Sequence, residues 1–347
     1  MKTFSQRLIL AVTAAIACAA NAAAQIPATG PAILEIDTEN YVEYENDANA
    51  ELEPTKIGTN PNIVVPTSPP PPFGRIVGFA DIVAVNGKAA KGLVFEWEVV
   101  FVASPTPNPG AAIADVPTLG TRLFTFQILQ SDGTRVGTIM TMGMSQTGSV
   151  LGPPPGAPLA QTGQELAIVG GTGAFLGARG QQGQERTPTT VNPRVASMLE
   201  DPSRRRINGG GTVRFIFQLF PMSRPQIAIT ANGPAVTHSS DFSLVTPSNP
   251  AAAGEILSVF ATGLGPTRPG VDAGQPFPSN STAVVNSPVE VTVNGKTAQV
   301  LAAVGYPSSV DGYQVNFRVP PDTAKGTATI QLSAAWIASP AVSVAIQ

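Results

Sequence analysis

Apolar and polar positions alternate along much of the chain with the period of two that is typical of β-strands. The clearest example spans residues 92–103, where Phe95, Trp97 and Val99 fall on one face. The opposite face is also largely apolar. We therefore expect this strand to be covered on both sides, as in a closed barrel or at an interface between subunits.

Turn residues divide the first half of the chain into further strands. Residues 75–85 precede the Asn86-Gly87 pair, which supplies the positive φ angles of a type I′ hairpin turn and leads into the strand at 92–103. A second hairpin is predicted around residues 131–133. The other strands expected in this half span residues 121–129, 136–144, 165–169 and 211–220, with Pro-rich loops at 54–73, 104–119 and around 153–155. This half has no capped helical pattern of ten residues.

The second half of the chain, which follows a linker at 221–225, contains shorter strands. They are predicted at residues 227–230, 256–261, 289–293, 298–304, 312–319, 327–332 and 341–346. About seven short strands over roughly 120 residues are typical of a β-sandwich of the immunoglobulin type. We therefore predict an all-β protein with two domains, at residues 32–222 and 226–347.

The first residues have the pattern of an export signal. Lys2 and Arg7 precede a largely apolar run at 8–17, which is too short to span a bilayer, and three alanines at 22–24 fit the site cut by signal peptidase. We expect a signal peptide at residues 1–24 and a mature protein that is secreted, periplasmic or on the cell surface. No later apolar stretch is long enough to predict a transmembrane segment.

The single cysteine, Cys18, lies inside this predicted signal peptide. It is either an ordinary apolar residue of the signal or a lipidation site, since residues 15–18 loosely resemble a lipobox. In both cases the mature domains are expected to have no disulfide and no thiolate chemistry.

Composition and charge exclude several classes of function. Only 12% of the 347 residues are charged, about half the usual share, and the net charge is −3, which gives no basic surface for nucleic acid. The single histidine, His238, has no G-x-S-x-G nucleophile elbow beside it and is expected to be a loop residue. One histidine is too few for a zinc site, so we expect neither metal nor cofactor.

Glu96 and Glu98 are the candidate catalytic residues, because they lie one residue apart on the same face of the predicted strand, about 7 Å from each other. If that face lines a barrel, burial raises at least one carboxyl pKa and makes a proton donor. If it faces solvent, both are ordinary surface charges.

Two further charged runs have a simple interpretation. The odd-numbered acidic and Tyr residues from Glu35 to Glu45 are expected to share one strand face, which either seats a cation or is an exposed acidic surface. Residues 188–208, which include the arginines at 204–206, are expected to be a mobile loop that is solvated or sensitive to proteases.

Residues 169–180 resemble the VGGTGxFxxARG signature of the dirigent and allene oxide cyclase superfamily. Residues 74–78 (Gly-Arg-Ile-Val-Gly) are similar to an early strand of that family, and 211–220 stand in the place of its closing strand. The resemblance covers about residues 32–222. It implies an antiparallel eight-stranded barrel, often a homotrimer, with an apolar cavity at one end for a small apolar ligand.

The plant enzymes of this superfamily use acidic, Arg and Tyr residues around the cavity. Their N-terminal acidic motif is not recognisable here, so no catalytic residue carries over. The glycine-rich run itself is expected to be structural, because its glycines permit unusual backbone angles and close strand approach. It has no Lys-Ser/Thr pair or following helix for a phosphate. The residues of this motif are Gly170, Gly171, Thr172, Gly173, Phe175, Gly177, Arg179 and Gly180.

Residues 226–347 resemble the IPT/TIG immunoglobulin-like module found in exported proteins of soil bacteria. The resemblance rests on three segments in order, at 254–266, 291–295 and 313–320. Nothing in that module implies catalysis. Three hypotheses follow: a barrel that binds an apolar ligand or partner with an appended surface or spacer module, an isomerase- or cyclase-like or dirigent-like barrel that steers a reactive intermediate, and a structural envelope component.

Overall fold

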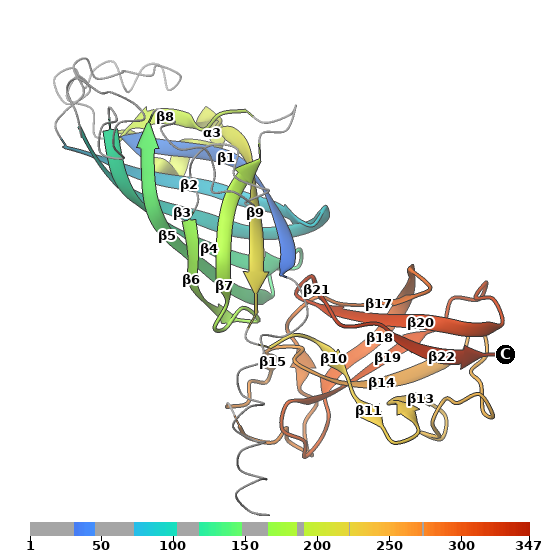
Figure 1. Ribbon diagram of the computed structural model, residues 1–347. Helices are drawn as coiled ribbons and strands as arrows, with labels where there is room; N and C mark the ends of the chain where they lie inside the picture. The colour runs from blue at the N-terminus through green and yellow to red at the C-terminus, as the bar shows by residue number, and fades with distance from the viewer. Residues whose placement is uncertain are drawn as a thin grey trace, which may run out of the picture. The chain divides into compact units, whose positions relative to one another are not determined.

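The computed structural model (Figure 1) describes residues 31–45, 73–102, 118–147, 166–185, 191–221, 223–272 and 274–347. The expected signal peptide with Cys18, and most of the predicted Pro-rich loops, lie outside these residues. No helix within the described ranges is long and apolar enough to cross a membrane.

Eight antiparallel strands of the first half form a closed barrel (Figure 1), which confirms the all-β class and the strand number. The order runs from β2 through β3, β4, β5, β6, β7 and β9 to β1, which pairs again with β2 and closes the sheet. The strands are β1 (Ala32–Glu45), β2 (Phe73–Val85), β3 (Lys88–Val102), β4 (Thr118–Gln130), β5 (Arg135–Thr147), β6 (Leu166–Gly173), β7 (Arg179–Glu185) and β9 (Gly211–Phe220).

The connections between these strands differ in length at the two ends of the barrel. At the hairpin end, β2–β3, β4–β5 and β6–β7 are joined by short turns, such as Asn86-Gly87 with its positive φ angles of 49° and 72°. At the opposite end, which we call the long-connection end, the chain passes through 46–72, 103–117 and 148–165 and then from β7 to β9. The ends of β1, β3 and β5 and the starts of β2, β4 and β6 therefore meet at this end.

Aromatic side chains fill part of the barrel interior. Phe126 contacts Phe215 and Phe217 with ring centroids 5.0 and 4.8 Å apart, and Phe124 lies 5.4 Å from Phe215. All four rings are fully buried, and edge-to-face packing of this kind stabilises beyond the area it buries. The apolar alternation of β4 and β9 thus supplies the core of the barrel.

A short segment lies against the outside of β1 and β2. It contains β8 (Arg194–Ser197), which runs parallel to the end of β1, then the 3-10 turn η2 (Pro202–Arg204) and the helix α3 (Arg205–Asn208). Arg205 and Arg206 both bind Asp81 on β2. The expected solvated loop is therefore wrong for Arg205, because a carboxylate on the barrel wall holds it.

The second half of the chain forms a curled eleven-stranded sheet and a two-stranded ribbon of β11 (Ile229–Thr230) and β12 (Gly233–Pro234). The sheet contains β10 (Gln226–Ile227), β13 (Val236–His238), β14 (Ile256–Thr262), β15 (Thr267–Arg268), β16 (Val284–Val285), β17 (Val289–Val293), β18 (Lys296–Gly305), β19 (Gly312–Arg318), β20 (Gly326–Ala334), β21 (Ile337–Ala338) and β22 (Val342–Ile346). Fully buried aliphatic and aromatic residues such as Leu257, Val315 and Phe317 form its core.

Candidate functional site

The inner face of β3 carries the two carboxylates that the sequence singled out. Glu96 is 0% and Glu98 is 4% exposed, whereas Trp97 between them points outward and is 40% exposed. The sequence left open whether these carboxylates line the barrel or face solvent, and the structure places both inside the barrel. Carboxylates in such a place need partners, because an isolated buried charge costs several kcal/mol.

Arg122 on β4 is the cation that these carboxylates share. It stands directly opposite Glu98 in the strand register. Its Nε lies 2.5 Å from Glu96 Oε1 and 2.9 Å from Glu98 Oε2, and its Nη2 lies 3.1 Å from Glu43 Oε1. Tyr41 completes the group, because its hydroxyl donates a hydrogen bond to Glu96 Oε2. We call these five residues the acid cluster.

A bulge in β1 brings Tyr41 and Glu43 into the barrel. Asn40 adopts a positive φ of 53°, and the β1–β2 register shifts between Glu39 and Val42. Before the bulge Glu35 and Asp37 point outward, where both contact Arg214. The predicted single acidic face is therefore wrong, because the extra residue reverses the inward and outward positions.

Gly78 on β2 makes the space for Glu96. Glu43 and Glu96 both pair with Gly78, one from each neighbouring strand. A Cβ atom at position 78 would lie 2.3 Å from Glu96 Oε2 and 2.8 Å from Glu96 Cβ. Gly78, the second glycine of the Gly-Arg-Ile-Val-Gly segment, therefore leaves the room that the Glu96 side chain occupies.

Gly78→Ala should lower the free energy of unfolding by about 2 kcal/mol, because the new methyl group overlaps the Glu96 side chain. The matched control is Gly74→Ala on the same strand, where the added methyl group meets nothing within 4 Å. Urea unfolding followed by circular dichroism measures both variants. Equal stability losses in the two variants would contradict this account of Gly78.

Burial and charge change the proton affinities of the acid cluster. Burial is the main reason that the pKa of Glu96 is raised to about 8, with Arg122 opposing the shift and Glu43 adding to it. Burial also raises the pKa of Glu43 and of Tyr41. The carboxylates raise the pKa of Arg122 against the effect of its burial, so that its charge is retained. At neutral pH the cluster therefore contains a protonated carboxyl group beside a fixed cation.

A second buried polar pair lies on the wall formed by β5 and β7. Thr141 donates a 2.8 Å hydrogen bond from Oγ1 to Gln182 Oε1, and both residues are at most 1% exposed. Gln182 Nε2 is buried and has no hydrogen-bond partner among the described residues. A buried amide N–H without an acceptor costs about 1–3 kcal/mol, so this group is unusual in a barrel core.

The acid cluster has the chemistry of a proton donor rather than of a metal centre. The guanidinium group of Arg122 lies among the three carboxylates, where a cation would otherwise bind. No group of His, Cys, Asp and Glu side chains is arranged to hold a metal ion in the part of the chain that is described. A protonated Glu96 has one O–H group that can donate to an oxygen atom, while the Tyr41 hydroxyl donates its own proton to Glu96 Oε2.

The glycine-rich run lies at the hairpin end, away from the acid cluster. β6 continues through Gly173, and the chain turns at 174–177 before Arg179 begins β7. Phe175 is fully buried and Arg179 is exposed. Gly173, Gly177 and Gly180 have positive φ angles. The run therefore forms a tight β-turn unit that packs into the barrel core.

His238 is a strand residue, so the expected loop position is wrong. It lies in β13, with Nδ1 2.5 Å from Glu255 Oε1 and Nε2 3.3 Å from the carbonyl oxygen of Asn249. Although burial opposes it, the hydrogen bond to Glu255 raises the histidine pKa. Both ring nitrogens are occupied by these contacts, which indicates a structural role.

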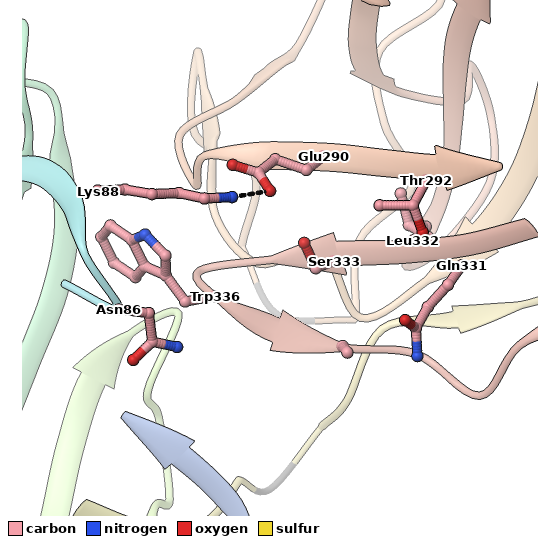
Figure 2. Close-up of a pocket in the computed structure, with 9 residues that line it drawn as sticks. Asn86, Lys88, Glu290, Thr292, Gln331, Leu332, Ser333 and Trp336 are labelled. Atoms are coloured by element: carbon pink, nitrogen blue, oxygen red, sulfur yellow. Dashed lines mark hydrogen bonds and ion pairs between the residues drawn. The ribbon is translucent and has the colours of Figure 1, made fainter. Parts of the chain in front are cut away.

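A shallow pocket is lined by the β2–β3 turn and by residues of β17, β20 and β21, with a volume of about 170 Å³. Figure 2 shows Lys88 directed at Glu290, with which it forms an ion pair, and Trp336 beside them. This volume is below the roughly 300 Å³ of ordinary small-molecule sites. We therefore place the candidate site at the acid cluster.

Sequence reasoning missed Arg122 and did not connect Tyr41 and Glu43, which it placed on a separate acidic strand face, with Glu96 and Glu98. The signal for Arg122 is present, because Arg122 alternates in phase with Phe124 and Phe126 and so belongs to the inward face of β4. Tyr41 and Glu43 depend on a bulge that no residue pattern marks. Gln182 follows a glycine-rich turn in a run of Gln and Gly, which has no readable alternation.

Comparisons with known proteins do not identify the functional site, so its assignment rests on the geometry of the acid cluster. No protein-family model and no curated protein matches the chain. Among solved structures, the chain is similar to the N-terminal domain of the Streptococcus gordonii adhesin Sgo0707 at 9% identity, over 79% of this chain and 86% of that one. The TM-score is 0.16, which carries no argument about fold or function.

Proposed function

We propose that this chain is an exported binding protein whose barrel holds a small, largely apolar molecule that carries an oxygen atom. The observation that supports this proposal best is the acid cluster, in which a buried Glu96 shares Arg122 with two other carboxylates. The apolar interior would surround the body of the molecule, and a donor of the acid cluster would bind its oxygen.

The energetic cost of the acid cluster supports a functional role. Replacing a buried group of charges by apolar residues of similar volume is often neutral or stabilising, so a charged group in a barrel core is weak evidence for stability. Carboxyl groups with strongly raised pKa values gather at binding and catalytic sites. The cluster lies toward the long-connection end, on the side where the strands run into the long connections of the chain.

The other assignments rest on the resemblances and remain part of this proposal. Residues 1–24 would be removed as a signal peptide, or Cys18 would anchor a lipoprotein. Residues 32–222 would be a dirigent- or allene oxide cyclase-like domain, and its assembly would be a homotrimer. Residues 226–347 would be an immunoglobulin-like, IPT/TIG-like module that acts as a spacer or surface contact.

The direct test of the proposal is native mass spectrometry of the protein purified from its own periplasm or medium. We expect a small molecule to remain bound and to be identified after extraction. A repeated absence of any bound molecule, together with no uptake of apolar probes, would contradict the binding function and favour the structural role in the envelope.

Binding of an oxygen-bearing probe should depend on the protonation of Glu96. The ketone probe 6-propionyl-2-(dimethylamino)naphthalene should bind about tenfold more weakly at pH 9 than at pH 6, because Glu96 with a pKa of about 8 loses its proton in between. Glu96→Gln keeps a donor that does not titrate, so its affinity should not change with pH. Fluorescence titration measures both. A pH dependence that persists in Glu96→Gln would contradict the role of Glu96.

A second candidate function is acid catalysis of an isomerisation or cyclisation. The observation that favours it is a carboxylic acid hydrogen-bonded to a tyrosine and held beside an arginine, which can donate a proton and stabilise the charge that develops. Catalysis predicts that the wild type and Glu96→Gln carry different molecules, the product and its precursor. Binding alone predicts the same molecule in both.

A further inference from the structure

The side chain of Gln182 is the one buried amide in the barrel wall whose donor is unused among the described residues. Its oxygen is occupied by the hydroxyl group of Thr141, which fixes the orientation of the amide. Gln182 is a buried, inward residue of β7, and with its oxygen occupied the NH2 group has no acceptor among the residues that the structure describes. A group with this cost is expected to have a partner that the protein itself does not supply.

The strand register places this amide across from the acid cluster. Arg122 on β4 pairs with Gly143 on β5, and Thr141 is the next inward residue of β5 toward the hairpin end. Gln182 on β7 pairs with Leu166, the first residue of β6. The wall between Arg122 and Gln182 therefore consists of Gly143, which has no side chain, and the apolar Leu166.

We propose that Thr141 and Gln182 form a second polar contact for the molecule in the barrel, with Gln182 Nε2 donating to an oxygen of that molecule. This inference rests on the proposed binding function and narrows the ligand class. The ligand is an apolar molecule with two hydrogen-bonding oxygens, one at the acid cluster and one at Gln182, joined by an apolar part over Gly143 and Leu166. Thr141 is a positioning residue, since it acts by orienting the amide.

Two fluorescent probes of similar aromatic size test this requirement for oxygen atoms in the ligand. The ketone probe for this test, 6-propionyl-2-methoxynaphthalene, has two acceptor oxygens at opposite ends of the rings, one for each polar contact, whereas N-phenyl-1-naphthylamine has none. In the full mature chain, Gln182→Met should raise the Kd of the ketone probe about tenfold, because a buried oxygen loses its donor. The Kd of N-phenyl-1-naphthylamine should stay within about twofold of the wild-type value.

Two further variants separate a ligand contact from a structural contact. Gln181→Met is the matched control, since Gln181 is the next residue of β7, points to the outer face and bonds Gln218 there, so both probes should bind it normally. The double variant Thr141→Val/Gln182→Met removes both polar partners together. It should melt at or above the wild-type temperature, because no buried polar group is left unpaired.

The possible results distinguish this inference from the proposed function. If both probes bind the wild type and Gln182→Met weakens only the ketone probe, the inference is supported. Equal effects on the two probes, or no effect on either, would overturn it and leave the binding function intact. A double variant that melts below the wild type would also overturn it, because the amide would then serve the fold. Failure of both probes to bind the wild type would overturn both proposals.

Discussion

Replacing Arg122 with methionine should lower the free energy of unfolding by about 3–5 kcal/mol, the largest loss that we expect from a single substitution in the barrel. Arg122 is the only cation within the acid cluster, and its side chain is 5% exposed. Methionine keeps much of the volume of the side chain but leaves three buried carboxylates facing one another. For a domain of this size the loss corresponds to a fall in melting temperature of roughly 10 °C.

The pH dependence of this loss tests its electrostatic origin. Folding raises the pKa of Glu96 from about 4.5 to about 8, so the folded state binds the additional proton between these values, and wild-type stability falls as the pH rises through this window. Without Arg122 the proton is held still more tightly. The destabilisation by Arg122→Met should therefore be larger at pH 9 than at pH 5.

The control for Arg122→Met combines it with Glu43→Gln, Glu96→Gln and Glu98→Gln. Because the carboxylates are then neutral, this combination should recover most of the lost stability, as judged by thermal unfolding. A loss that is the same at both pH values, and that the glutamine substitutions do not relieve, would mean that Arg122 acts by packing alone.

Gly171→Ala should lower the free energy of unfolding by about 3 kcal/mol, while Gly170→Ala should change it by less than about 1 kcal/mol. A Cβ atom at 171 would lie 2.3 Å from the carbonyl oxygen of Phe175 and 2.7 Å from that of Thr138. Both atoms belong to the backbone of the β6–β7 turn and of β5, which cannot rotate away. At Gly170 the nearest atom is the methyl carbon of Met140 at 3.7 Å, an ordinary contact.

The two adjacent glycines therefore form an internal control for the glycine-rich run. Differential scanning calorimetry of the two alanine variants would measure the difference in melting temperature, which we expect to be several degrees. If the pair were instead equally sensitive, the close approach of β5 to the turn would not be the reason for glycine at 171.

The sequence predicted the strands because the core imposes a period of two on them. On β3, for example, Val94, Glu96 and Glu98 point inward and the residues between them point outward, as the alternation requires. The hairpin turn at Asn86-Gly87 was also readable, since these residues take up positive φ angles at low cost.

The remaining features depend on contacts between distant segments. The bulge at Asn40 reverses the phase of β1, and what fixes it is pairing with β2 and β9 on either side. The turn at Ala335 and Trp336 has positive φ angles of 49° and 62° in residues that rarely adopt them. Arg205 binds Asp81 from more than a hundred residues away. No local pattern marks such positions, because tertiary packing supplies the energy that holds them.

The closure of the barrel through its first strand has a consequence for the order of folding. Ala32 pairs with Leu219, so the two strands that flank the seam are the first and the last of the barrel. The loop-closure entropy of the whole intervening chain must be overcome before this pairing contributes any stabilisation. Until Gly211–Phe220 has been synthesised, β1 has an unpaired edge, which is a template for association with other chains. We therefore expect the barrel to fold slowly, with the pairing of β1 and β9 as its last step.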